Sequence, residues 1–353
     1  MPVIISHQSA LEYLRAVPPP FFGAQRLQTN YDLAHESTTR SDLRHFRPAD
    51  VGLSLPQTHV LMHAYSQRGR DPQYSYHVCQ ATDLAPGSIL RIGDNVYSCG
   101  PEFAFYQLSQ KLSQLQAVVL ACELCAKYSH FAKPVSGFYQ RPPLTSVAQM
   151  QQFLDKHPSL MFQKKARAAL SYALDNSESP METVMALFLS LPRVIGGFNC
   201  LPPNLNYEVP LDEAGRRMIQ KTHCRVDLAW PELKIGLEYD GKEYHGDAVG
   251  DRRRREALLH LGWQIFTVSF DDISSIYRLE RSVLQPLADK LPRRNPPTRS
   301  RGGLDEAVSD KEERLRREHL LNTLLAETRF GWGLTAAFFP FTNSNQKIRL
   351  CLK

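Results

Sequence analysis

Two acidic side chains, Asp227 and Glu238, stand in neighbouring short segments whose residues alternate between apolar and polar. Residues 224–229 and 235–240 have the two-residue period of strands, and residues 230–233 between them have the composition of a short turn. The pattern predicts a β-hairpin that carries one acid on each strand.

The spacing of this hairpin decides whether the two acids meet. If it closes symmetrically about Pro231 and Glu232, Asp227 lies opposite Gly236, and Glu238 is its diagonal neighbour on the same face. Sheet geometry then separates the two Cα atoms by roughly 7 Å, close enough for both carboxylates to reach one cation. The residues expected on the other face, toward a core, are Val226, Leu228, Leu237 and Tyr239.

Acids on one strand face repel each other unless a positive charge lies between them, and Asp240 adds a third acid to this face. A hard cation with oxygen ligands supplies that charge, so Mg²⁺ is the expected metal, with Mn²⁺ as the alternative. An exposed hairpin face with solvated acids remains the competing interpretation of the hairpin alone.

The residues after the hairpin predict a βαβ unit. Gly241 ends the second strand, Asp251 caps a helix that runs through His260, and Gly262 stops it. The apolar segment 263–270 then forms a strand parallel to that of Glu238, because a crossover helix returns the chain in the same direction.

The residues before the hairpin predict a helix and one more strand. Ser179 and Pro180 suit the start of a helix that contains Glu182, and residues 205–209 read as a strand. The order of elements is therefore helix, three strands, helix, strand. We expect an α/β fold with a mixed sheet flanked by helices, preceded by a smaller α+β module.

This order and these residues resemble the PD-(D/E)XK nuclease superfamily, in particular the very-short-patch-repair endonucleases and allied bacterial endonuclease-like domains. The resemblance covers about a third of the chain, residues 179–291. The residues that carry it are Arg225-Val226-Asp227-Leu228-Ala229-Trp230-Pro231-Glu232, Glu238-Tyr239-Asp240-Gly241, His245, Asp251, Arg254 and Gly262-Trp263.

The resemblance implies roles for individual residues. Asp227 stands at the principal metal-binding aspartate, Glu238 at the acidic member of (D/E)XK, and Glu182 at the helix glutamate that often completes the metal site. His245 stands where the patch-repair enzymes have a histidine near the reacting phosphate. The implied restriction-endonuclease-like domain would hydrolyse phosphodiester bonds of DNA with Mg²⁺.

The sequence departs from the superfamily at the lysine of (D/E)XK, where it has Asp240. The patch-repair-like group lacks lysine there as well. The group that polarises the attacking water is therefore open between His245 and Lys242, with His245 the stronger candidate because an imidazole serves as acid or base near neutral pH. A structural role for His245 is the alternative.

Basic residues follow the acids along the chain. Four consecutive arginines occupy 252–255, and Arg252, Arg254 and Arg255, with Lys242, are the predicted nucleic-acid contacts. Only one or two of the four can face a substrate. A solvated surface, with packing and an Arg252–Glu256 ion pair, is equally compatible with this run.

The rest of the chain divides by composition. Residues 1–145 predict the α+β module, with strands at 59–63, 74–80 and 89–98 and helices from Ser6 and from Pro101. Residues 146–178 predict a helical bridge of two helices, and residues 292–353 a linker, a charged helix over 305–328 and a tail. The N-terminal module and residues 305–328 are the candidate surfaces for a protein partner.

Composition sets the broad class. The chain has 353 residues, 42% of them hydrophobic, and a formal net charge of +6, which tolerates a nucleic-acid partner without requiring one. It has no apolar run long enough for a membrane span and no signal-peptide pattern, so we expect a cytoplasmic protein. Cys122 and Cys125 form a CxxC pair without a second pair, which favours buried core thiols.

The N-terminal module also resembles the antitoxin-like regulatory modules of abortive-infection systems, at Ser6-His7-Gln8-Ser9-Ala10 and Gly100-Pro101-Glu102. That resemblance implies a module that binds nucleic acid or a partner protein. Two functions follow for the whole chain: a Mg²⁺-dependent DNA endonuclease in repair, restriction or phage defence, or a non-catalytic DNA-binding regulator that keeps a nuclease-like fold.

Overall fold

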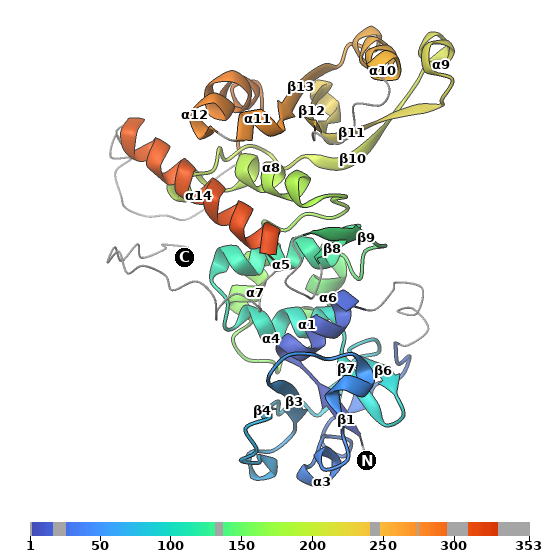
Figure 1. Cartoon of the computed structure of the whole chain (residues 1–353), viewed down its shortest axis with the longest axis vertical. Coiled ribbons are helices and arrows are strands. Elements are labelled where there is room, and N and C mark those ends of the chain that lie inside the picture. Colours follow the sequence, from blue (N-terminus) through green and yellow to red (C-terminus); the bar gives the residue numbers. More distant parts are fainter. Residues whose placement is uncertain are drawn as a thin grey trace.

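The structure is a computed structural model, and it describes residues 2–16, 26–130, 137–240, 248–273, 275–294 and 310–330. It has a mixed α/β architecture in which two sheets lie at opposite ends of an elongated molecule, with a layer of helices between them (Figure 1). None of the described helices is long and apolar enough to cross a membrane.

The N-terminal sheet has five strands in the order β4-β3-β1-β7-β6. The β1–β7 and β3–β4 pairs are parallel, and the β1–β3 and β6–β7 pairs are antiparallel. The strands are β1 (Val3–Ile5), β3 (Thr58–Met62), β4 (Tyr74–Val78), β6 (Ile89–Gly93) and β7 (Val96–Cys99). The strand segments predicted near 59, 74 and 89 are confirmed, whereas the three-residue β1 is too short to leave an alternating pattern.

Four further strands form two small sheets, each an antiparallel pair. They are β2 (Tyr31–Asp32) with β5 (Asp83–Leu84), and β8 (Tyr128–His130) with β9 (Phe138–Gln140). None of the four was predicted, because two or three residues carry no period.

Two helices of the central layer begin at a serine cap. The Ser113 side chain accepts a hydrogen bond from the backbone N–H of Gln116, and the Ser146 side chain accepts one from Gln149. Pro101 occupies the first turn of its helix, as predicted. The helices of this layer include α1 (His7–Ala16), α4 (Pro101–Ser109), α5 (Gln114–Cys125), α6 (Val147–Lys156) and α7 (Gln163–Leu170). The short α3 (Arg40–Leu43) lies outside the layer, at the end of the molecule that holds the N-terminal sheet (Figure 1).

The C-terminal sheet has four strands in the order β10-β11-β12-β13. The β12–β13 pair is parallel and α10 connects it, so the predicted βαβ unit is confirmed. The strands are β10 (Asn204–Pro210), β11 (His223–Trp230), β12 (Ile235–Asp240) and β13 (Gln264–Ser269). The helices around them are α8 (Pro180–Ser190), α9 (Glu213–Ile219), α10 (Ala248–His260), α11 (Phe270–Ile273), α12 (Ile276–Leu279) and α13 (Gln285–Ala288).

Several helices of this part differ from expectation, and the short α11, α12 and α13 were not predicted. α10 begins at Ala248, three residues before the predicted cap at Asp251. The seven-residue α9, between β10 and β11, was not predicted, although Asp212 caps it by accepting a hydrogen bond from the backbone N–H of Gly215.

The register of the β11–β12 hairpin differs from the predicted one by two residues. Leu228 pairs with Leu237 and Ala229 with Gly236, because residues 231–233 form a 3₁₀ turn and Lys234 adopts a left-handed conformation (φ 51°). The prediction of a symmetric turn at Pro231 was therefore wrong. A shift of two residues does not by itself move a side chain to the other face, and continuation of this register places Asp227 opposite Glu238.

One hydrophobic core runs through most of the molecule, from α1 at one end to β11 and β12 at the other. Cys122 and Cys125 are fully buried in it, as predicted, and burial raises the pKa of Cys122 to about 12. Because this core crosses residues 145 and 179, it does not mark the predicted domain limits, which stay a prediction.

The charged C-terminal helix, α14 (Asp310–Phe330), packs along α8 and α5 (Figure 1). Its Leu320, Leu321 and Leu324 are buried in the main core, and Arg317 is buried beside Glu280. Its inner face is therefore part of the fold, and a partner surface on residues 305–328 stays a prediction for the outer face. The described part of that range begins at residue 310.

Candidate functional site

The two acidic strands meet at an interruption in the β-ladder. Leu205 pairs with Leu228 and Tyr207 with Val226, so Asn206 stands across from Asp227, yet Asn206 has a left-handed backbone (φ 53°) and makes no ladder pair. The left-handed region is open to asparagine more than to most residues. The ladder thus opens at the position of the principal predicted metal ligand.

The alternation of side chains along β11 also breaks at Asp227. Val226 packs in the small core under α10, whereas Leu228 packs in the main core on the α8 side. A Cβ on Gly236 would lie 2.6 Å from Cγ1 of Val226, which places Val226 on the Ala229–Gly236 face. The expectation that Val226 and Leu228 share one face was therefore wrong, because the strand changes face at Asp227.

Glu182 reaches this interruption from the first turn of α8. Ser179 caps the helix by accepting a hydrogen bond from the backbone N–H of Glu182, and the Glu182 side chain is buried (6% exposed). Its Oε2 accepts hydrogen bonds from the backbone N–H of Glu178 (2.8 Å) and from Nδ2 of Asn206 (2.6 Å). Burial, and then the charge of Asp227, raises the pKa of Glu182 to about 7.

The Asp227 carboxylate lies against the backbone of β12. Its Oδ2 accepts a hydrogen bond from the backbone N–H of Tyr239 (2.9 Å), which replaces a ladder bond. Burial raises the pKa of Asp227, against the opposing effect of that hydrogen bond and of the Arg254 charge. The nearby charge of Glu178 acts in the same direction as burial.

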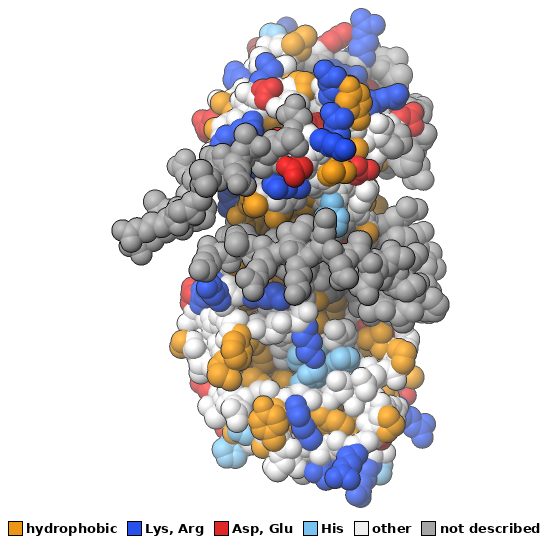
Figure 2. Space-filling view, turned by 90° about the vertical axis from the view of Figure 1, so that its left-hand side faces the viewer, with side chains coloured by type: hydrophobic (Ala, Val, Ile, Leu, Met, Phe, Trp, Pro, Cys, Tyr) orange, Lys and Arg blue, Asp and Glu red, His pale blue; other side chains and the backbone are white. Residues whose placement is uncertain are grey.

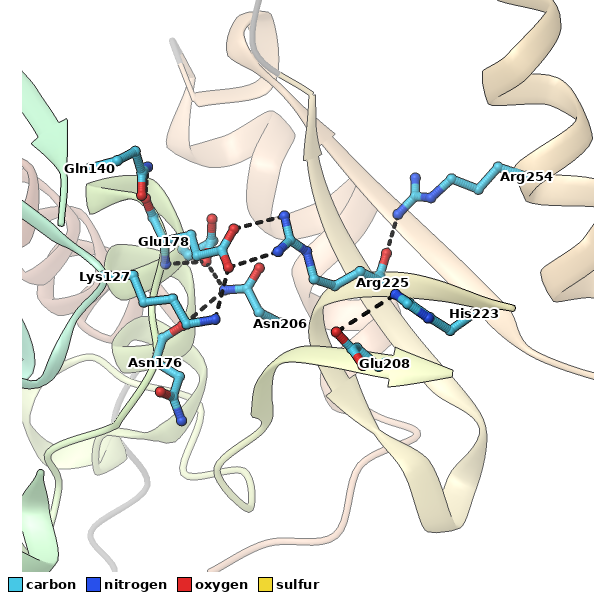
Figure 3. Close-up of polar contacts among 10 residues, drawn as sticks. Lys127, Gln140, Asn176, Glu178, Asn206, Glu208, His223, Arg225 and Arg254 are labelled. Carbon is cyan, nitrogen blue, oxygen red and sulfur yellow. Dashed lines mark hydrogen bonds and ion pairs between the residues drawn. The ribbon is translucent and has the colours of Figure 1, made fainter. Parts of the chain in front are cut away.

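Glu238 is neutralised from within the protein. Arg254 of α10 donates to both of its carboxylate oxygens, from Nη2 to Oε1 (2.6 Å) and from Nη1 to Oε2 (3.0 Å). Arg254 also donates to the backbone carbonyl of Arg225 (Figure 3). Burial nevertheless raises the pKa of Glu238, and the charge of Asp227 adds to the effect.

Asp227 lies between the other two acids, Glu182 on the α8 side and Glu238 on the α10 side. Its charge raises the pKa of both. Asp227 is thus near enough to each of the other two predicted metal ligands for its charge to act on them. Carboxylate oxygens are the donors that Mg²⁺ prefers, and mutual repulsion of partly buried acids is what a cation would relieve. The donor chemistry fits Mg²⁺.

The three acidic side chains converge less closely than the prediction required. Among the residues that the structure describes, no group of three or more histidine, cysteine or acidic side chains is placed to hold a metal ion. The physical reason is visible at Glu238, where the Arg254 guanidinium occupies both oxygens. A cation at this carboxylate would have to share it with Arg254 or displace it.

A network of ion pairs that the sequence did not predict lies beside the three acids. Glu178 forms ion pairs with Arg225 (2.8 Å) and with Lys127 (3.0 Å), so it links the end of α5 to β11 beside the acids (Figure 3). Asn206, which binds Glu182, was missed as well. A left-handed asparagine and an ion pair between residues 47 positions apart leave no mark in the local pattern.

The remaining predicted site residues are either exposed on β12 or α10 or lie outside the described residues. Asp240 is exposed at the end of β12. Lys242 and His245, the candidates for polarising water, lie outside the described residues. Arg252 and Arg255 are exposed on α10, and with Asp251, Glu256 and Leu259 they line an open hollow of about 480 Å³. Figure 2 shows basic side chains on the upper half of the molecule.

Among the four arginines of α10, Arg254 differs from its neighbours because it turns inward to Glu238. Arg252 pairs with Glu256 (2.9 Å), the predicted i,i+4 contact, and keeps a side chain that is 81% exposed. Arg253 and Arg255 are exposed too. The outward arginines are therefore available to a polyanion, and Arg254 belongs to the acidic site.

Comparison with known proteins gives relatives but no function. The chain is 33% identical over 112 residues to two uncharacterized proteins of Mycobacterium tuberculosis, from two strains, and the match covers 31% of this chain. It spans 36% of the length of those relatives. No family model and no solved structure matches the chain.

Proposed function

We propose that the chain is a metal-dependent endonuclease that hydrolyses phosphodiester bonds in DNA, with a restriction-endonuclease-like domain over residues 179–291. The observation that carries the proposal is the gathering of Glu182, Asp227 and Glu238 from three elements around one ladder interruption. Such a repulsive, partly buried cluster lowers stability and is expected at a functional site.

In this proposal each acid has a defined part. Glu182, Asp227 and Glu238 hold Mg²⁺, and Asn206 orients the Glu182 carboxylate through its amide. When bound, the ion shields the phosphate charge and activates a water. Arg252 and Arg255 contact backbone phosphates on either side of the scissile bond, which raises affinity without reading sequence.

Plasmid nicking tests the proposal directly. Wild-type protein is expected to relax supercoiled DNA with Mg²⁺ or Mn²⁺ and to lose this activity with a chelator. Asp227→Ala is expected to reduce the rate by at least about 10³-fold, because removal of a metal ligand removes the charge shielding of the transition state. Glu232→Gln, in the exposed turn between the same strands, is the matched control and should keep the wild-type rate.

Equal nicking by wild type and Asp227→Ala would point to a contaminating nuclease. Absence of cleavage in both metals on double-stranded, mismatched and single-stranded DNA would contradict the proposal.

A second function has one specific observation in its favour. Arg254 already neutralises Glu238, as a protein without a metal would require. The alternative is therefore a DNA-binding regulator that keeps the nuclease-like fold. It predicts DNA binding that salt weakens, that Arg252→Ala and Arg255→Ala reduce, and that occurs without cleavage.

A further inference from the structure

Three histidines from distant parts of the N-terminal module lie in contact, outside the site described above. His59 is on β3, His77 is on β4, and His7 is the first residue of α1. The parallel register pairs His59 with Ser75 and Leu61 with His77, so the first two histidines share one face of the sheet. His7 has a left-handed backbone (φ 48°) and lies over that face.

The rings of His59 and His77 form a hydrogen-bonded pair, and the ring of His7 stacks on that pair. His59 and His77 lie within 9° of parallel, and Nδ1 of His59 is 2.8 Å from Nε2 of His77. At this distance one of the two nitrogens must carry a hydrogen and donate it to the lone pair of the other, because two facing lone pairs form no hydrogen bond. The His7 ring stacks on His77 with centroids 3.6 Å apart, which fixes the plane of the His77 imidazole.

The cluster holds its imidazoles in the uncharged form. Burial, and then the charge of Lys111, lowers the pKa of His59 to about 4 and that of His77 to about 3. Burial also lowers the pKa of His7. At neutral pH the nitrogens therefore bear lone pairs without first losing a proton, which is the form that binds metal.

The site is also open to solvent. His59 and His77 are partly buried, and histidine side chains reach the surface of the lower half of the molecule beside a basic side chain (Figure 2). Lys111 itself is exposed, so solvent screens its repulsion of a cation.

We propose that His59 and His77 form a two-nitrogen site for a divalent transition metal ion of the zinc class. The ion takes the place of the shared hydrogen between Nδ1 of His59 and Nε2 of His77. The ring that carried this hydrogen releases it to solvent and takes up a proton at its other nitrogen, so both imidazoles stay uncharged. Two nitrogens on one tetrahedral zinc ion stand about 3.3 Å apart, so the 2.8 Å gap opens by roughly half an ångström.

The chemistry of the cluster selects this class of metal. Imidazole nitrogens suit zinc, nickel and copper, whereas Mg²⁺ and Ca²⁺ require oxygen donors. His7 stacks on His77 and its ring plane does not point into the gap, in keeping with the lack of a three-ligand group among the described side chains. The other coordination positions are left to water or to an external ligand.

Calorimetric titration of the full chain with ZnCl₂, in saturating MgCl₂ to fill oxygen-donor sites, tests the proposal. Wild-type protein is expected to bind zinc with an affinity that His59→Gln and His77→Gln each reduce by about tenfold or more. His45→Gln, at an exposed position away from the cluster, is the matched control and should bind as wild type does. Equal affinity in wild type and both cluster variants overturns the proposal.

A second measurement on the wild-type protein covers the case in which a variant does not fold. Acylation of individual histidines by diethyl pyrocarbonate is followed by mass spectrometry with and without zinc. Zinc is expected to slow modification of His59 and His77 by about tenfold or more and to leave His45 unchanged. Equal rates at His59 and His77 with and without zinc overturn the proposal.

Discussion

Arg254 holds both carboxylate oxygens of Glu238, and a residue of the crossover helix thereby places a positive charge directly on the acidic site of the sheet. The contact joins α10 to β12, the helix and the first strand of the βαβ unit. It gives the metal-free protein a charge-compensated site, and it makes Arg254 a competitor of any cation that Glu238 would bind.

The competition can be measured through Arg254→Gln. Without the guanidinium, Glu238 is free for a cation, so we expect the affinity for Mn²⁺ to rise by about tenfold, the equivalent of ~1.4 kcal/mol. The metal-free variant should also be less stable by about 1–3 kcal/mol, because a buried carboxylate has lost its partner. Calorimetric Mn²⁺ titration and thermal unfolding check both effects.

Arg252→Gln is the control for Arg254→Gln, since the Arg252 side chain is 81% exposed and pairs with Glu256, away from Glu238. An unchanged Mn²⁺ affinity in Arg254→Gln would show that the guanidinium and the metal do not compete. Absence of Mn²⁺ binding in wild type and variant alike would instead count against the proposed metal site.

Glu182 is expected to lower the stability of the metal-free protein. Its folded pKa of about 7 exceeds the ordinary value of 4.5, so the folded state binds the proton more tightly. Stability therefore falls as the pH rises from about 4.5 to about 7 and stays low above it. Glu182→Gln should raise the free energy of unfolding at pH 8 by about 1–3 kcal/mol and abolish nicking.

Chemical denaturation of wild type and Glu182→Gln at pH 5 and pH 8 checks this sign. The difference should be small at pH 5 and clear at pH 8. A variant that is less stable than wild type at pH 8 would mean that Glu182 stabilises the fold through Asn206 and Glu178 instead.

The buried pair of Arg15 and Glu123 predicts the opposite dependence at acid pH. Burial opposes ionisation of Glu123, but the charge of Arg15, bound at 2.7 Å, lowers the pKa of Glu123 to about 2. The pair therefore stabilises the fold above pH 4.5, by about 3 kcal/mol, and this contribution is lost as the pH falls toward 2.

Acid unfolding followed by circular dichroism checks the contribution of the Arg15–Glu123 pair. The double variant Arg15→Met with Glu123→Gln should unfold with a weaker pH dependence between pH 4.5 and 2 than wild type. Arg15→Met alone should be destabilised by about 3–5 kcal/mol at neutral pH, because it leaves a buried charge without its partner. An identical acid transition in wild type and double variant would refute the assignment.

Gly196 is expected to be required for docking of α14. It has a φ of +101°, and a Cβ there would lie 2.3 Å from the backbone carbonyl oxygen of Arg316. Gly196→Ala should therefore lower the free energy of unfolding by about 2–4 kcal/mol, through overpacking and backbone strain. Gly52→Ala separates the two causes, since Gly52 has a φ of +78° but open space around it. Its cost should be only about 1 kcal/mol, and similar losses in both variants would show that α14 does not press on Gly196.

Local patterns in the sequence determined most of the elements around the candidate site. Ser179 and Pro180 mark the start of α8, and the periods of β11, α10 and β13 reflect the faces that these elements bury. These signals are local because a cap, a turn and an alternating face each depend on residues within a few positions. They placed Glu182, Asp227 and Glu238 on the elements where they occur.

Only the tertiary structure decided how those acids are held. The two-residue shift of the hairpin, the change of face at Asp227 and the left-handed Asn206 depend on packing between β10, α8 and α10. The partners of the acids, Arg254 and Asn206, come from segments 16 and 24 positions away. The sequence by itself determined which carboxylates are present and on which strands and helix. Long-range packing decided their charge balance, because a salt bridge or a buried amide forms between residues that only the fold brings together.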